Sequence, residues 1–183
     1  VTIACKRVLD SCKKCISLEN TRLALRRAPQ GVAPFTFVNG LSTQVDATIS
    51  DLSVTRLEER PCFARIKCTV SVPVQVTVDD ASGVRSTVPS EIVVPEDIVM
   101  YVPEASMFPF EIVACASCNC AAGAFDADGN CNVTACMTVI TKVIAETDLL
   151  VPAYGYCPTP TAVDYEEQIC NRFFDLPMYP SGK

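Results

Sequence analysis

The stretch that decides the fold is Cys62–Asp80, CFARIKCTVSVPVQVTVDD. Every second residue from Cys62 to Val78 is apolar, and most of the residues between them are polar. This period of two predicts a long, half-buried strand with one face toward a core. Pro73 falls on the outward face and cannot donate a ladder hydrogen bond, so it predicts an edge strand or a bulge at that point.

Shorter strand patterns lie on both sides of this stretch. They are separated by turn signals such as DDASG (79–83) and by prolines in the middle of the chain. Many strands punctuated by turns predict an all-β body over residues 31–150, an antiparallel β-sandwich or jelly roll. The further strands are expected at residues 45–54, 86–94, 98–102, 110–118 and 132–145.

The two ends of the chain differ from this body. Residues 1–30 carry seven of the 15 Lys and Arg residues and three cysteines. We expect them to form an N-terminal arm, within which Ser17–Arg27 fits either a short helix or an extended segment. Residues 151–183 are rich in proline and tyrosine, which predicts an irregular C-terminal tail.

The composition restricts the function. The net charge of −6 argues against nucleic-acid binding, which needs a basic face. The apolar runs are interrupted by charged residues, so no membrane insertion is expected. The chain has no histidine to act as a general base or metal ligand, and no pair of carboxylates stands out. We therefore predict no cofactor and a protein that is not an enzyme.

Five of the 12 cysteines lie in the segment from Cys115 to Cys136, CASCNCAAGAFDADGNCNVTAC. If residues 110–120 and 131–145 form an antiparallel hairpin, paired residues have a constant index sum. A sum of 251 places Cys115 opposite Cys136 and also Cys120 opposite Cys131, within disulfide range. These two pairs are the expected disulfides within the chain.

A structural zinc site is the main alternative for the cysteines. Cys12 and Cys15 form one C-x2-C pair, and Cys115 and Cys118 form another; four thiolates are a common zinc set. The two pairs lie far apart in the sequence, and eight cysteines would remain unexplained. Redox catalysis by CKKC lacks a βαβ context, and the DADGN loop lacks the glycine and glutamate of a calcium loop.

The remaining cysteines suggest contacts with another subunit. Thiols at the ends of the chain can reach a neighbour, so we predict intermolecular disulfides from Cys5, Cys12, Cys15, Cys157 and Cys170. Cys62 and Cys68 are expected on the inward face of the long strand as buried thiols. An arm that pairs with the sheet edge of a neighbour, in a contact that does not close into a ring, would build a filament.

The opening CKRVLDSCKKC followed by SLEN resembles the N-terminal region of a family of cysteine-rich clostridial proteins, some of which are associated with spore coats. In plan, the chain is also similar to endospore appendage subunits, small jelly-roll proteins whose cysteine-bearing N-terminal connector cross-links stacked subunits. This resemblance implies that Cys5, Cys12 and Cys15 are connector thiols. It also implies a place on the spore or cell surface, which such proteins reach without a secretory signal.

The sequence thus predicts a structural subunit that assembles with copies of itself into a disulfide-cross-linked fibre or layer, extracellular or on the spore surface. The alternative is a zinc- or ligand-binding β domain that uses the C-x2-C pairs.

Overall fold

The computed structural model describes residues 1–103, 109–126, 128–152 and 155. The chain divides into two units, one comprising Thr2–Leu150 and the other comprising Val1 with Val151–Lys183. Within the second unit, Val1 and Val151 exchange two backbone hydrogen bonds of 2.9 Å. Apart from Pro152 and Gly155, the rest of the predicted tail, with Cys157 and Cys170, lies outside the described residues.

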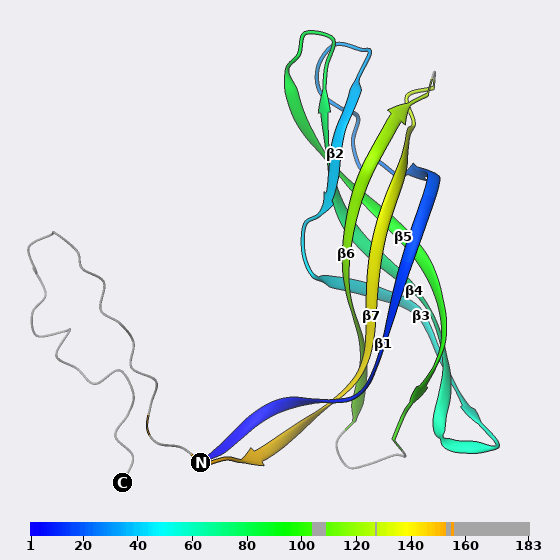
Figure 1. The fold of residues 1–183 in the computed structure, drawn as a ribbon, viewed down its shortest axis with the longest axis vertical. Coiled ribbons are helices and arrows are strands. Elements are labelled where there is room, and N and C mark those ends of the chain that lie inside the picture. Colours follow the sequence, from blue (N-terminus) through cyan, green and yellow to red (C-terminus); the bar gives the residue numbers. More distant parts are fainter. Residues whose placement is uncertain (104–108, 127, 153–154, 156–183) are drawn as a thin grey trace, which may run out of the picture. The chain divides into compact units, whose positions relative to one another are not determined.

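Thr2–Leu150 is an antiparallel all-β unit, as predicted (Figure 1). Its architecture is sandwich-like. The seven strands are β1 (Thr2–Leu23), β2 (Thr36–Ser42), β3 (Asp46–Leu57), β4 (Arg60–Asp79), β5 (Arg85–Tyr101), β6 (Phe110–Phe125) and β7 (Cys131–Leu150).

Two short stretches of pairing join the two halves of this unit. Strands β1, β7 and β6 pair in that order, and β4 pairs with β5. β2 and β3 both pair with β4, and each also reaches β6, through Gly40–Leu41 and Asp46–Ala47 respectively. β2 and β3 thereby connect the β1–β7–β6 half to the β4–β5 half.

The two outermost strands, β1 and β5, approach each other without forming a ladder. Isolated hydrogen bonds cross this seam, among them Tyr101 N–H to Asp10 Oδ2 at 2.7 Å and Ser90 Oγ to the Ala24 carbonyl at 3.1 Å. The contacts between β1 and β5 therefore close the core on the side where these two strands form no ladder.

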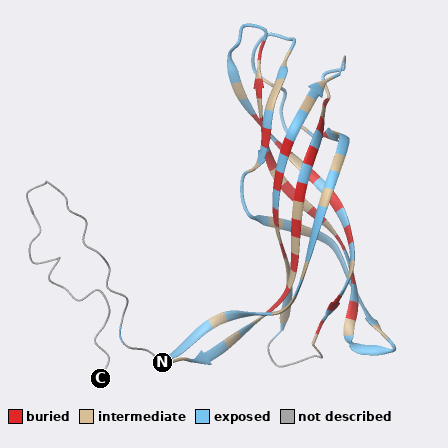
Figure 2. Ribbon diagram, viewed as in Figure 1, coloured by how far each residue is buried: buried red, intermediate tan, exposed pale blue. Residues whose placement is uncertain are grey.

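The core follows the alternation predicted for β4. Ala64, Ile66 and the valines at 70, 72, 74, 76 and 78 are at most 1% exposed. β7 contributes a matching inward row from Cys131 to Val143. The buried bands along these strands are visible in Figure 2. Because the valines are β-branched and fill a pleated surface well, the sequence of β4 suits its central place.

Three prolines fit the sheet in different ways. Pro89 and Pro95 lie within β5, which has a sheet partner on one side only, so the missing N–H groups need not break a ladder. β5 consequently merges the two strands predicted at 86–94 and 98–102. Pro73 is in β4, a central strand, and pairs with Glu91 of β5 in a register without a shift, so the predicted edge strand or bulge is not found there. Pro73 lies between Val74, paired with β2, and Ser71, paired with β3, where the ladder passes from one strand to the other.

The predicted separation of residues 1–30 as an arm is wrong for most of that segment. β1 pairs with β7 from Thr2 to Leu23, and Leu23 is buried. The short apolar pattern around Leu18, which also fitted a helix, instead supplies inward side chains to a strand. A long partner strand satisfies the backbone of β1 and overrides its weak helical pattern.

Cys62 was expected on the buried face of the long strand, but it is exposed. It lies near the beginning of β4, before the inward row becomes fully buried at Ala64. Cys68, the second thiol expected there, is buried at 5% exposure.

The alternation makes a prediction about stability. Ile66→Ala removes a fully buried side chain and should lower the free energy of unfolding by about 2–5 kcal/mol, because it leaves a cavity in the core. Gln75→Ala, on the exposed face of the same strand, should change it by no more than about 0.5 kcal/mol. Urea unfolding of both variants measures the difference, and equal losses would contradict the described orientation of β4.

Candidate cross-linking surface

The pleat of the strands divides the ten described cysteines into an inner and an outer set. Cys68, Cys118, Cys120 and Cys131 are buried, and half-buried Cys12 packs against the same core. Cys15, Cys62 and Cys136 are exposed, and Cys5 and Cys115 are half-buried. No disulfide joins any of the described cysteines.

Cys118 and Cys120 are neighbours on the inward face of β6. Their thiols share a hydrogen bond, which together with burial raises the pKa of Cys118 far above the usual range. Gly40 on β2 permits the close approach of Cys120, since a Cβ at Gly40 would stand 3.0 Å from the Cys120 sulfur. The same hydrogen bond lowers the pKa of Cys120. Both side chains are buried, at 2% and 1% exposure, and pack in the core as small groups.

Cys131 begins β7 and is completely buried. Burial, with a smaller contribution from Cys120, raises the pKa of its thiol to about 11. At neutral pH it is almost entirely protonated, and a protonated thiol is a poor nucleophile.

The outer thiols gather on the face of the β1–β7–β6 half that points away from the core. Cys15 is opposite Thr138 of β7, with 3.8 Å between its sulfur and the Thr138 hydroxyl oxygen. Cys136 is on the same strand as Thr138, two residues away, and shares its outward face. Cys115, on β6, has the same outward orientation. We call Cys15, Cys115 and Cys136 the outer thiol patch.

The predicted disulfide register is wrong. Over most of their length β6 and β7 pair with an index sum of 255, so Cys115 is opposite Ile140 and Cys120 is opposite Ala135. The strands run on through Phe125 and Cys131, and the connection is only Asp126–Asn130. The Asp126 carboxylate accepts hydrogen bonds from the N–H groups of residues 128 and 130 and thereby holds this turn. A bulge at Ala121 makes the index sum one higher for the pairs between the bulge and the turn.

No described cysteine has another cysteine directly opposite it on a neighbouring strand. The nearest arrangement in the outer patch is diagonal, between Cys15 and Cys136. Diagonal residues have Cα atoms about 7–8 Å apart, which exceeds the usual disulfide range of about 4.4–6.8 Å. The sheet as it stands therefore supplies no relaxed intrachain partner for the outer thiol patch.

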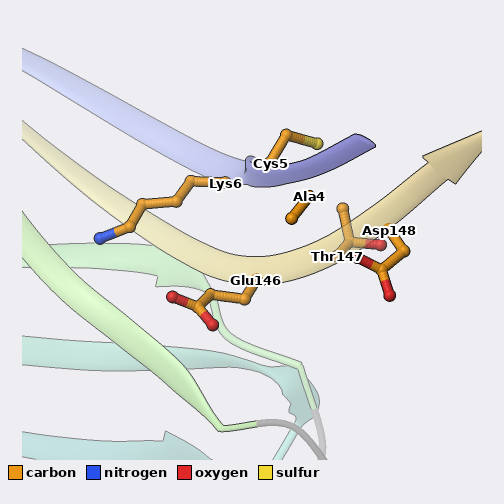
Figure 3. A pocket seen from close by; sticks show the side chains of 6 residues that line it. All are labelled: Ala4, Cys5, Lys6, Glu146, Thr147 and Asp148. Atoms are coloured by element: carbon orange, nitrogen blue, oxygen red, sulfur yellow. The ribbon is translucent and has the colours of Figure 1, made fainter. Parts of the chain in front are cut away.

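Cys5 lies in a two-stranded ribbon formed by Thr2–Lys6 of β1 and Glu146–Leu150 of β7. β6 begins opposite Ala145, so the ribbon extends beyond it as a separate projection (Figure 1). Cys5 lines a pocket on the ribbon together with Ala4, Lys6, Glu146, Thr147 and Asp148 (Figure 3). Of the predicted arm, this short ribbon is the part that projects.

The structure does not bring together the zinc ligands of the alternative interpretation. In an extended strand, residues three apart point to opposite faces. Cys12 faces the core and Cys15 faces outward on β1, while Cys118 faces the core and Cys115 faces outward on β6. β7 also separates the two strands. Among the described residues, no group of three or more possible metal ligands is close enough to hold an ion.

A buried carboxylate at the seam was not foreseen. The side chain of Glu96, on β5, is 1% exposed; its Oε2 lies 3.3 Å from Lys14 Nζ of β1, and its Oε1 has no hydrogen-bond partner among the described residues. It is opposite Cys68, and burial followed by the charge of Glu96 raises the pKa of that thiol. Every second residue of β5 from Val88 to Val94 faces inward, and extending this alternation by one step would have predicted that Glu96 is buried.

In the part of the chain that the structure describes, no helix has the length and apolar character needed to cross a membrane. Searches against protein-family models, curated proteins and solved structures give no significant match to this chain.

The two sets of thiols should differ in reactivity. In the reduced protein at pH 8, iodoacetamide should alkylate Cys15 and Cys136 rapidly, because they are exposed. Cys131 should react at least about a hundredfold more slowly, since its raised pKa leaves little thiolate and its burial blocks access. Peptide mass spectrometry over time measures these rates. Equal alkylation of Cys131 and Cys136 in the folded protein would contradict the inner and outer assignment.

Proposed function

We propose that this protein is a non-enzymatic structural subunit that assembles with copies of itself into a fibre or layer cross-linked by disulfides. The observation that carries the proposal is the position of its accessible thiols. The outer thiol patch has no cysteine directly opposite it in the sheet, and Cys5 lies in a ribbon that projects beyond β6. Such thiols are well placed to find partners on another chain.

The cross-link requires an oxidising environment. Two thiols of neighbouring chains lose two protons and two electrons to molecular oxygen or to a small-molecule disulfide, and one S–S bond forms. Disulfides persist outside the reducing cytosol, which supports a place on the spore or cell surface. The resemblance of the opening segment CKRVLDSCKKC to spore-coat-associated proteins supports the same location.

The inner thiols have a different part in this proposal. Cys118, Cys120 and Cys131 are at most 2% exposed, so they are shielded from a neighbouring chain while the subunit is folded. Cys12 was grouped with the connector thiols, but its contact with the core makes it a weaker candidate than Cys5 or Cys15. The cross-linking residues that we propose are therefore Cys5 and the outer thiol patch, with Cys157 and Cys170 of the tail as their partner thiols on a neighbouring chain.

A set of serine variants tests this proposal. A variant with Cys5→Ser, Cys15→Ser, Cys115→Ser and Cys136→Ser should fold but lose most of the reductant-sensitive, high-mass species seen on non-reducing gels after air oxidation. Cys12→Ser, which changes an inward thiol of the same strand β1, should keep them. Far-ultraviolet circular dichroism and urea unfolding confirm that each variant is folded.

Two outcomes would count against the proposal. Undiminished high-mass species in the fourfold variant would remove these thiols from the cross-link. A wild-type protein that stays monomeric after oxidation, at any accessible concentration, would remove the polymer itself.

A further inference from the structure

The two ends of β1 and β7 present different surfaces. At one end is the ribbon, Thr2–Lys6 with Glu146–Leu150. At the other end, where β1 finishes and β7 begins, the segment after β1 and the β6–β7 turn line a groove. We call it the end groove; it is formed by Arg22, Leu23, Leu25, Arg27, Pro29 and Asn130, with smaller neighbours. A strand of about 20 residues spans roughly 65 Å, so the two surfaces are far apart on one chain.

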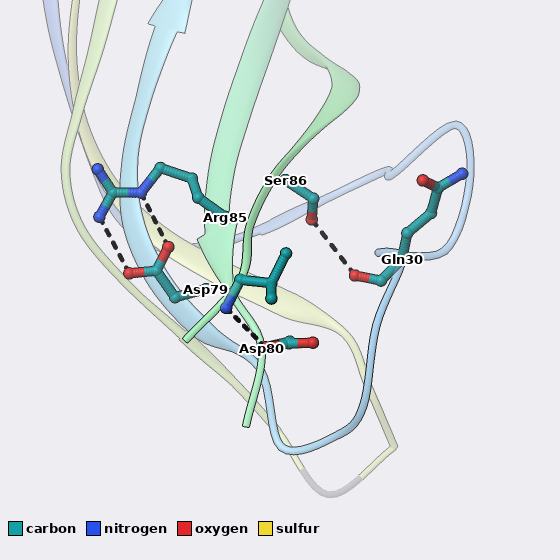
Figure 4. A network of polar contacts seen from close by, with 6 residues as sticks. Gln30, Asp79, Asp80, Arg85 and Ser86 are labelled. Atoms are coloured by element: carbon teal, nitrogen blue, oxygen red, sulfur yellow. Dashed lines mark hydrogen bonds and ion pairs between the residues drawn. The ribbon is translucent and has the colours of Figure 1, made fainter. Parts of the chain in front are cut away.

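The end groove is held in a fixed shape. Arg26 N–H donates to the Pro89 carbonyl at 2.9 Å, and the guanidinium of Arg27 donates to the Thr87 carbonyl at 3.1 Å. Further along the same segment, Ser86 Oγ donates to the Gln30 carbonyl (Figure 4). These bonds attach the segment to β5, so a ligand would meet a preorganised surface.

The groove combines cationic and apolar groups. Arg22 and Arg27 are exposed and hydrogen-bond neutral oxygens, those of Asn130 and Thr87. Neither guanidinium forms an ion pair with a described carboxylate, although Asp126 lies near enough to Arg22 for the two charges to interact. Buried Leu23 and half-buried Leu25 supply an apolar floor.

The ribbon has the complementary character. Glu146 and Asp148 are exposed, and neither forms an ion pair with a described cation. Lys6 is opposite Glu146, but its ammonium group lies 3.7 Å from a Glu111 carboxylate oxygen. The ribbon also exposes large apolar side chains, with Ile3 41%, Leu149 46% and Leu150 83% exposed.

We propose that the end groove of one chain binds the ribbon of a second copy, with Arg22 and Arg27 facing Glu146 and Asp148. This inference rests on the proposed function and names the contact that would precede its cross-links. The contact joins different surfaces of the two copies and lies at opposite ends of a long unit, so its repetition gives a linear chain rather than a closed dimer. Opposite charges would also orient the copies before any disulfide forms.

Charge exchange between two variants tests the contact. The first variant carries Glu146→Lys and Asp148→Lys, which makes the ribbon cationic. The second carries Arg22→Glu and Arg27→Glu, which makes the groove anionic. Each variant alone should stay mostly monomeric on non-reducing gels after air oxidation at low ionic strength. An equimolar mixture should recover high-mass species, because each ribbon then meets a groove of opposite charge on the other variant.

The controls separate this contact from the cross-linking function. The control for the ribbon variant carries Glu58→Lys and Glu59→Lys at the exposed β3–β4 turn. It has the same change in net charge as the ribbon variant and should polymerise as wild type does. If wild type and both exchange variants polymerise equally, or if the mixture recovers nothing, the groove contact is wrong while the cross-linked polymer stands. If wild type itself stays monomeric, both proposals fail.

Discussion

The alternation of side chains along extended strands is the constraint on which the rest of this structure depends. In β4 it turns an apolar row of β-branched residues toward the core, and in β7 it supplies the facing row. The same alternation sorts the cysteines, because a thiol one position away from a core residue must face outward. The alternation that buries the core thus also decides which thiols are accessible for reaction.

The seam between β1 and β5 shows what the fold tolerates when a ladder is missing. Scattered hydrogen bonds and the pair of Lys14 with Glu96 connect the two edges. Burying the Glu96 carboxylate is costly because one of its oxygens has no described partner. Exposed strand edges are sites of pairing with other chains, and these contacts reduce the unpaired edge that β1 and β5 would otherwise present.

The sequence was a good guide where a pattern was long and regular. It predicted the long strand, its buried row and the all-β antiparallel class, because the period of two over Cys62–Val78 has no helical counterpart. It failed where one additional residue in a strand or turn changes the pairing register. The bulge at Ala121 and the short turn at Asp126 shift the β6–β7 register by four to five residues in index sum, and neither has a strong signature in the sequence.

Two other failures have a related cause. β1 carries a weak pattern of its own, and its place in the sheet is fixed by β7, a partner more than a hundred residues away. The C-x2-C pairs suggested zinc only as long as their backbone conformation was unknown, since an extended strand separates the two thiols onto opposite faces. The ribbon with Cys5 could not be recognised because it depends on where β6 begins, not on the residues of the ribbon itself.

We propose that Cys5 and the outer thiol patch link one chain to another, while the buried thiols stay within the fold. Mass spectrometry of disulfide-linked peptides from unreduced, alkylated polymer tests it most directly, with equal amounts of ¹⁴N- and ¹⁵N-labelled chains mixed before oxidation. We expect mixed-isotope linkages that involve Cys5, Cys15, Cys115 or Cys136, with Cys118, Cys120 and Cys131 absent from any link between chains. Linkages of uniform isotope only, or mixed-isotope linkages through the buried cysteines, would contradict it.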